Sequence, residues 1–308
     1  MQRELLLGVV IALLGLMISG NVLAQVTTTT LFGRVTDATG SPLVGASVKA
    51  ANKETNLTRT TQSGPDGEYR IELLPVGDYS LEVTASGFKK FVRSGIVLEI
   101  NVPARADAAM EIGELSQTVT VTGGAPLVNT TSAEVGRTVE NAEVVNLPLV
   151  NRNVYQLLTL TPGVQYNSTQ FGQPSIVLGY PEQRTLINGG VDGGAGSVSY
   201  YLDGGINMTG LRNTGNILPN PDAIQEFRVE TNNYDAEYGK MSGGVINVIT
   251  KSGTNNFHGS LFEFTRNNDL NANFWGSKLP QPPGQRNQFG GTVGGPIIKD
   301  KTFFFFSY

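Results

Sequence analysis

Apolar and polar residues alternate with a period of two through much of the first third of the chain. The clearest stretch is residues 79–85, where alternating positions are apolar (Tyr79, Leu81, Val83, Ala85) and polar (Ser80, Glu82, Thr84). This pattern predicts a strand with one buried face. Turn signals at residues 39–42, 64–67 and 75–78 separate such stretches. About seven short strands with turns between them predict a small β-sandwich over residues 31–112.

The middle of the chain mixes two periodicities. Val154, Leu157 and Leu158 share one face of a helix, and Pro162 predicts its end, because proline disfavours helical angles in the preceding residue. Residues 245–249 form a nearly continuous apolar strand, which predicts burial on both faces.

The last part of the chain reads as three strands of a barrel. Strands are expected at residues 257–265, 288–298 and 302–308, joined by a loop over 267–286 and a tight turn at 299–301. Long loops alternating with short turns are typical of outer-membrane barrels, and the aromatic run 303–306 with Tyr308 suits their interfacial girdle. An ordinary soluble strand core is the alternative, and four consecutive phenylalanines fit it poorly.

The N-terminus carries the features of a secretory signal in residues 1–24. An apolar run over residues 5–18 precedes small side chains, which predicts cleavage between Ala24 and Gln25. A membrane anchor is the alternative, but the run is short for a bilayer that needs about 20 apolar residues. Residues 25–30 are a polar lead-in.

Composition removes several classes of function. The chain has no cysteine and one histidine, His258, so a thiolate metal site is excluded and a zinc site or catalytic triad would depend on that histidine alone. The net charge of −4 is too mild to indicate nucleic-acid binding. The glycine-rich stretch at 189–194 fits neither a dinucleotide fingerprint nor a phosphate-binding loop. We expect no cofactor, no metal and no nucleic-acid partner.

Two stretches resemble the carboxypeptidase regulatory-like domain. They are GRVTDATGSPLVGASVKA (33–50) and GPDGEYRIELLPVGDYSLEVTASGF (64–88). The resemblance implies a prealbumin-like β-sandwich that serves as an accessory and carries no catalytic residues. Fold analogy alone connects such domains with carbohydrate binding.

Three later stretches resemble the plug of TonB-dependent receptors, in particular the Oar-like branch: LPLVNRNVYQLLTLTPGV (147–164), YLDGGIN (201–207) and PNPDAIQEFRVETNNYDAEYGKMSGGVINVITKSGTNNFHGS (219–260). Residues 231–235 depart from the Arg-Gly-Pro loop of many members, a variation that Oar-like members share. The expected fold is mainly β: a sandwich (31–112), a linker (113–126), a mixed α+β plug (127–251) and the first strands of a truncated transmembrane barrel (252–308).

A short β-prone segment lies in the linker. The sequence LSQTVTVTGGAPLV (115–128) alternates threonine with valine, and two interpretations stay open. It is either a linker that pairs with a sheet edge or a TonB box, which an energy-coupling protein captures by strand addition. Residues 27–30 are another place for such a box. The candidate coupling residues are Gln117, Thr118, Val119, Thr120, Val121 and Thr122.

The resemblance implies the N-terminal part of an outer-membrane receptor of a Gram-negative bacterium, with the plug and sandwich on the lumenal and periplasmic side. Its expected function is energy-coupled uptake of an unidentified small extracellular ligand, with carbohydrate slightly favoured. The expected partners are a TonB-type periplasmic protein and outer-membrane lipid. Because transport breaks no bond in the ligand, no enzyme activity is expected. Polar plug residues are candidates either for ligand contact or, more simply, for loop support: Asp203, Asp222, Glu226 and Arg228.

Two other classes of protein share parts of this pattern. A zinc carboxypeptidase would need two histidines and a glutamate at metal-binding spacing, which a chain with one histidine does not supply. A surface adhesin or structural envelope protein shares the signal and the sandwich but has no reason to carry plug motifs. Oar-like relatives also leave the direction of transport open.

Overall fold

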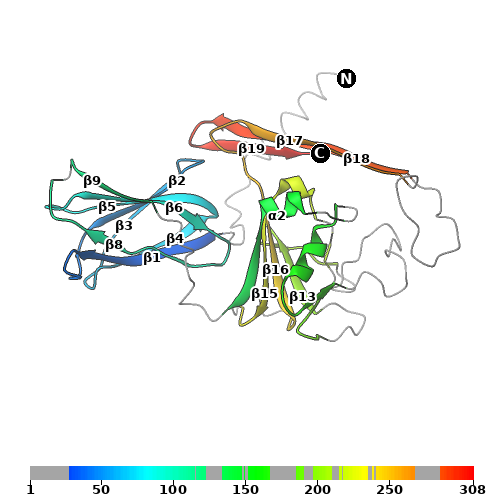
Figure 1. Ribbon diagram of the computed structural model, residues 1–308, viewed down its shortest axis with the longest axis horizontal. Helices are drawn as coiled ribbons and strands as arrows, with labels where there is room; N and C mark the ends of the chain where they lie inside the picture. Colours follow the sequence, from blue (N-terminus) through cyan, green and yellow to red (C-terminus); the bar gives the residue numbers. More distant parts are fainter. Residues whose placement is uncertain are drawn as a thin grey trace, which may run out of the picture.

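The computed structural model contains three bodies that follow one another along the chain: an N-terminal β-sandwich, a central domain and a C-terminal sheet (Figure 1). The structure describes residues 28–114, 116–122, 134–147, 149, 152–166, 185–190, 197–209, 215–216, 218–234, 238, 241–267 and 285–308. The expected signal sequence and its cleavage at Ala24 and Gln25 lie outside the described residues. Among the described residues, no helix has the length and apolar character needed to cross a membrane.

The β-sandwich is built from two sheets. In the first, β1 (Thr28–Asp37) pairs with β4 (Glu68–Pro75) antiparallel and with β7 (Ala104–Arg105) and β8 (Ala108–Met110) parallel. The second has the order β3 (Thr58–Gln62), β2 (Ser47–Asn52), β5 (Gly77–Thr84), β6 (Lys90–Leu98) and β9 (Thr118–Thr122).

Alternating side chains of both sheets form the sandwich core. Tyr79, Leu81 and Val83 are fully buried on β5, as the period-two pattern predicts. Gly33 allows β1 to approach the 104–106 backbone, since a Cβ atom there would lie 2.1 Å from the carbonyl oxygen of Ala106. The expected mainly β fold with an N-terminal sandwich is confirmed.

The central domain has a five-stranded sheet with helical segments on one side. The strand order is β10 (Val135–Glu140), β15 (Ile224–Asn232), β16 (Gly244–Thr250), β13 (Val198–Leu202) and β14 (Gly205–Ile206). The other elements are α2 (Asn141–Asn146), the 3-10 helices η2 (Val154–Leu160) and η4 (Pro221–Ala223), and the pair β11 (Val164–Tyr166) and β12 (Thr185–Ile187).

Two sequence expectations for this domain are met. Side chains of β16 are buried on both faces, because helical segments cover one face and polar residues and tyrosines cover the other. The predicted helix is η2, which buries Val154, Leu157 and Leu158 and ends at Leu160, before Pro162.

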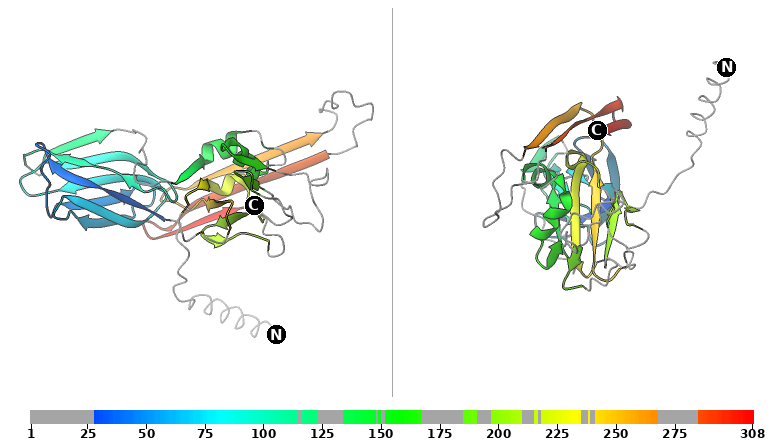
Figure 2. Two further views of the ribbon diagram at one scale, coloured as in Figure 1. Left: turned by 90° about the horizontal axis from the view of Figure 1, so that it is seen from below. Right: turned by 90° about the vertical axis from the view of Figure 1, so that its right-hand side faces the viewer.

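The C-terminal sheet contains β17 (His258–Asn267), β18 (Gln285–Ile298) and β19 (Thr302–Ser307), all antiparallel. The three strands and the tight turn are where the sequence predicts them, and most of the expected loop lies outside the described residues. The sheet runs along one side of the central domain, next to α2 (Figures 1 and 2). The connection from β16 passes close under it, since a Cβ atom at Gly253 would lie 2.2 Å from the carbonyl oxygen of Phe304.

The core of the sandwich gives a direct test of this packing. Leu81→Ala should lower the free energy of unfolding of the sandwich by about 2–5 kcal/mol, because it leaves a cavity among fully buried side chains. Leu57→Ala is the matched control, since Leu57 lies at the surface of the same sandwich and should change stability by less than about 0.5 kcal/mol. Urea titration measures both; equal losses would contradict the assigned core.

Candidate functional site

The expected coupling segment forms β9, the edge strand of a sandwich sheet. β9 runs parallel to β6, with Lys90 opposite Thr118, and the Lys90 amide donates to the Gln117 carbonyl at 2.9 Å. Of the side chains at 118–121, that of Val119 is half-buried and the others are exposed. The strand is therefore held mainly by its backbone. Pairing with a sheet edge was one of the two interpretations of this segment, and the sheet extends beyond residue 112.

The register of this pairing fixes which way each amide of β9 points. Parallel strands exchange hydrogen bonds through alternate residues. Since Lys90 donates to Gln117, the amides of Val119 and Val121 face β6, and those of Thr118 and Thr120 face away from the sheet. Among the described strands, β9 pairs only with β6. Its outer edge therefore presents backbone donors and acceptors to a further strand.

The loop that follows β6 docks on strand β15 of the central domain. The amide of Ile100 donates to Oε1 of Glu226 at 2.7 Å. The side-chain amide of Asn101 donates to Oε1 of Glu230 at 3.2 Å and to the hydroxyl of Tyr238 at 2.9 Å. Ile100 is buried there. We call this contact the β15 seat: Ile100 and Asn101 on Glu226, Glu230 and Tyr238.

The β15 seat buries charged groups. Glu226 and Glu230 flank Arg228 on one face of the strand, and all three are buried. Arg228 donates to Glu230 at 3.2 Å and to the Thr138 hydroxyl at 3.1 Å. Loss of solvation on burial raises the pKa of Glu226 to about 7, against the opposing effect of the Ile100 amide. Burial also raises the pKa of Glu230. Ionisation of either buried carboxylate therefore costs solvation free energy.

A second contact joins the sandwich to the C-terminal sheet. The side-chain amides of Asn56 and Asn255 each donate to Oδ1 of Asp300 at 2.7 Å, and the Asp300 amide donates back to Asn255 at 2.8 Å. The Asn255 amide donates to the Glu54 carbonyl at 3.0 Å. We call this contact the turn clamp: Glu54 and Asn56 on Asn255 and Asp300. Its side chains are exposed or half-buried.

The sandwich turn in this clamp is shaped by a buried asparagine. Oδ1 of Asn52 accepts the amides of Glu54 at 2.9 Å and Thr55 at 3.0 Å. Asn56 and Asp300 both adopt left-handed backbone angles, with φ of 57° and 63°. Asparagine and aspartate tolerate that region better than other residues with a Cβ atom, which explains their presence at both turns.

The central domain is anchored to the C-terminal sheet by an arginine. Arg152 forms an ion pair with Asp222, and its guanidinium lies 4.1 Å from the ring centroid of Phe262 and 4.4 Å from that of Phe264. Asp222 also accepts a hydrogen bond from the Ser260 hydroxyl at 3.1 Å. Cation–π and charge-assisted contacts together hold this side of β17 against the domain.

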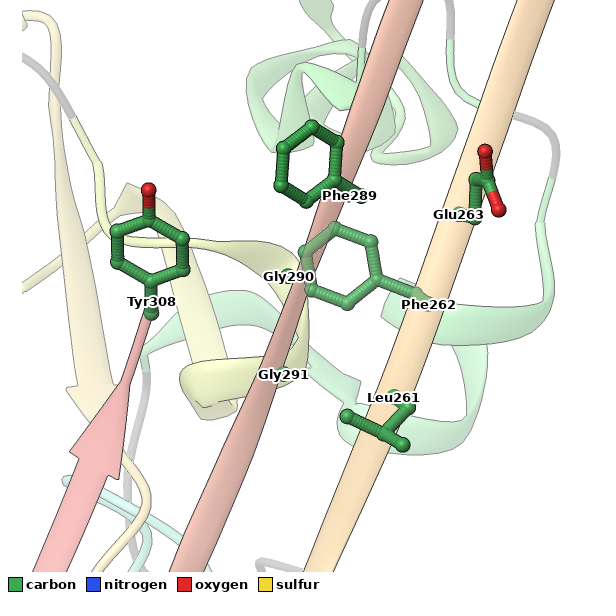
Figure 3. Close-up of a pocket in the computed structure, with 7 residues that line it drawn as sticks. All are labelled: Leu261, Phe262, Glu263, Phe289, Gly290, Gly291 and Tyr308. Carbon is green, nitrogen blue, oxygen red and sulfur yellow. The ribbon is translucent and has the colours of Figure 1, made fainter.

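The opposite face of the C-terminal sheet is exposed and mainly apolar. The cross-strand pairs place four large apolar side chains on it, and Leu261 is 93% exposed: Leu261, Phe289, Val293 and Phe306. They also place Glu263 there, opposite Phe289. Figure 3 shows Leu261, Glu263 and Phe289 on β17 and β18, with the Phe262 ring across Gly290 and Tyr308 at the end of β19. A sheet that is anchored on one face and mainly apolar on the other suits contact with lipid, although Glu263 adds a charged group to that face.

The polar candidates from the sequence have separate positions. Asp203 supports a loop, since its carboxylate accepts from the amide and hydroxyl of Thr250, each at 2.8 Å. Asp222 joins the central domain to β17, and Glu226 and Arg228 belong to the β15 seat. The described residues contain no group of three His, Asp or Glu side chains placed to hold a metal ion.

The sequence points to Asp222 and Glu226 among the residues that join the three bodies, without indicating that role. It gives no role to Ile100, Asn101, Asn56 or Asn255, and it places Asp300 only in a tight turn. The available signal was weak, since Asn and Asp at turn positions are common in any β protein.

Comparison with known proteins finds two domain matches and one curated relative that aligns with nearly the whole chain. Residues 30–111 match the carboxypeptidase regulatory-like domain, and residues 249–308 match an outer membrane beta barrel domain. The chain is 29% identical over 310 aligned positions to the TonB-dependent transporter Oar of Myxococcus xanthus, covering 97% of this chain and 28% of that protein.

Two weaker similarities accompany it. Colossin-A of Dictyostelium discoideum is 26% identical over 54% of this chain, which spans 1% of that protein. The siderophore receptor PirA of Acinetobacter baumannii has a solved structure that matches 54% of this chain and 22% of its own, with 25% identity and a TM-score of 0.37. The chain thus spans about a quarter of the transporter it resembles along nearly its full length. It is similar to the TonB-dependent transporter Oar over nearly its whole length, and it carries a carboxypeptidase regulatory-like domain followed, at residues 249–308, by a match to an outer membrane beta barrel domain.

Proposed function

We propose that this chain is the N-terminal part of an energy-coupled transporter in which β9 is the strand captured by a TonB-type periplasmic protein. The single observation that carries the proposal is the open outer edge of β9. Strand addition needs a row of unpaired backbone donors and acceptors on an exposed, extended segment. Residues 118–122 supply that row in the neighbourhood where the family resemblance expects the coupling segment.

The other two bodies have matching roles in this proposal. The central domain is the plug, and β17, β18 and β19 are the first strands of the barrel that surrounds it. The support for this assignment is the two-faced C-terminal sheet. One face carries Ser260, Phe262 and Phe264 against the central domain, and the other carries exposed apolar residues.

The proposed activity is uptake of a small extracellular ligand into the periplasm. Capture of β9 and a pull powered from the inner membrane rearrange the plug, and the ligand passes without any bond being broken. The protein is therefore not an enzyme and needs no cofactor in this proposal. Carbohydrate is the ligand class that the regulatory-like sandwich favours.

Proline substitution on the two edges of β9 tests the coupling segment. Thr120→Pro should weaken binding of the purified periplasmic domain of the TonB-type protein to the intact receptor at least about tenfold, because it removes a donor from the outer edge. Val119→Pro should also weaken binding, by loosening β9 from β6. Thr120→Ala and Val119→Ala keep the backbone donors and are the matched controls. Binding is measured by titration against receptor in detergent.

Unchanged binding in both proline variants would mean that the coupling segment lies outside residues 117–122. Residues 27–30 are then the next candidate. Loss of binding in the alanine controls as well would mean that side chains, and not backbone donors, carry the interaction. That result would contradict strand addition.

A charged side chain placed on the exposed face of the C-terminal sheet tests whether that face contacts lipid. Leu261→Arg should destabilise the intact receptor in lipid vesicles by about 2–4 kcal/mol if residue 261 lies near the bilayer centre, and by less towards its surfaces. Leu57→Arg on the sandwich surface is the control and should have little effect. Urea unfolding in vesicles and in detergent measures both variants. Equal stability of Leu261→Arg and wild type in lipid would contradict a lipid-facing sheet.

A further inference from the structure

The sandwich contacts both other bodies at points far apart in sequence. At the β15 seat it contacts the central domain through Ile100 and Asn101. At the turn clamp it contacts the C-terminal sheet through Glu54 and Asn56. Asn255 of the clamp lies on the segment that connects the central domain to β17. The sandwich therefore spans the junction between the other two bodies.

Movement of the central domain against the C-terminal sheet has to break one of these contacts. The sandwich is built around a single continuous core, so it moves as one piece. Small polar contacts of this kind do not fix two domains rigidly. The sandwich therefore restrains the two bodies by at most the free energy of its weaker contact.

Strand β6 connects the coupling strand to the β15 seat. β9 pairs with residues 90–94 of β6, and β6 continues to Leu98, two residues before Ile100. A load applied to β9 reaches β6 through the parallel hydrogen bonds, and β6 leads directly into the loop that docks on Glu226 and Glu230. No other described strand lies between the point of capture and the seat.

We propose that the β-sandwich is a releasable brace, which holds the central domain against the C-terminal sheet through the β15 seat and the turn clamp, and which opens at the β15 seat when β9 is pulled. The proposal rests on the proposed function, because it takes β9 as the point where load is applied. It adds a resting lock that the accessory sandwich supplies.

The β15 seat is the contact suited to open, because closing it buries polar groups without satisfying all of them. Oε2 of Glu230, a residue of the seat, is buried and has no hydrogen-bond partner among the described residues. Opening gives this oxygen access to water, which offsets the lost contacts. Opening the turn clamp gains less solvation free energy, because its side chains are already exposed or half-buried.

The charge environment of Glu226 makes the seat sensitive to pH. Burial raises its pKa from 4.5 to about 7; Glu99 and Glu140 act in the same direction, and the Ile100 amide and Arg228 oppose them. Glu226 therefore binds its proton more tightly in the closed seat than in an open, solvated seat. The closed seat is therefore favoured most below pH 4.5 and loses this advantage as the pH rises to about 7.

Hydrogen exchange on the intact receptor tests the brace without depending on any ligand. The combined change Asn56→Ala and Asn255→Ala should lower the protection factor of the Ile100 amide about tenfold, because the two contacts share one rigid body. Lys53→Ala is the control, since Lys53 is exposed on the same turn and outside the clamp. Unchanged protection at Ile100 in the clamp variant would overturn the brace.

The pH dependence of hydrogen exchange at Ile100 distinguishes opening of the β15 seat from a general loss of stability. After correction for intrinsic exchange, wild-type protection at Ile100 should fall between pH 5.5 and pH 8. Glu226→Gln should remove that fall, because glutamine keeps an oxygen acceptor for the Ile100 amide but does not titrate. A pH dependence that is identical in Glu226→Gln would mean that Glu226 does not govern the seat and would overturn this part of the proposal.

Cysteine labelling in cells tests release under load. Residues 1–308 contain no cysteine, so two single variants are clean reporters in a full-length receptor whose remaining residues have also been freed of cysteine. Thr120→Cys reports capture through a bis-maleimide cross-link to a cysteine introduced into the TonB-type protein. Ile100→Cys reports opening by its rate of reaction with a maleimide. The expected result is cross-linking at Thr120→Cys, together with labelling at Ile100→Cys that is several-fold faster in energised cells than after a protonophore.

The outcomes distinguish the two proposals. Cross-linking at Thr120→Cys with gradient-independent labelling at Ile100→Cys would overturn the brace and leave the coupling role of β9 intact. Absence of cross-linking would overturn the coupling role itself. If Ile100→Cys fails to fold, hydrogen exchange of the wild-type Ile100 amide with and without the clamp still decides the question.

Discussion

The parallel pairing of β9 with β6 is the interaction on which the organisation of this chain depends. It brings a segment that follows the sandwich in sequence back onto the sandwich sheet, and it leaves one row of backbone groups directed outwards. Because little side-chain burial accompanies it, the strand is held by hydrogen bonds that another strand can imitate. The same strand β6 continues into the loop that docks on the central domain.

The buried charges of β15 offset part of the free energy gained when the sandwich docks on this strand. Arg228 between Glu226 and Glu230 compensates part of the negative charge, and the Ile100 amide compensates another part. The remaining solvation cost is visible in the raised pKa of Glu226. A wholly apolar contact of similar size would be more stable and would have no titrating group to loosen it.

Local patterns in the sequence were enough for the elements but not for the contacts between them. The period of two over residues 79–85, the apolar run in β16 and the three C-terminal strands are each visible within about ten residues, because side-chain alternation is a property of a single strand. The sequence does not determine the partner of β9, because a threonine–valine alternation specifies a strand without specifying its neighbour. Asn56 and Asp300 are 244 residues apart and carry only ordinary turn chemistry. The family resemblance predicted a sandwich, a plug and the start of a barrel. Only the folded chain shows how the three bodies contact one another.

The close passage at Gly253 limits how the central domain and the C-terminal sheet can approach each other. The connection from β16 runs so near the backbone of β18 and β19 that a methyl group at this position would overlap the carbonyl oxygens of Phe304 and Gly295. Such a fit leaves no room for any side chain at position 253. A substitution there has to push the connection away from the sheet or separate β18 from β19, so a single missing Cβ atom sets how closely the two bodies can approach.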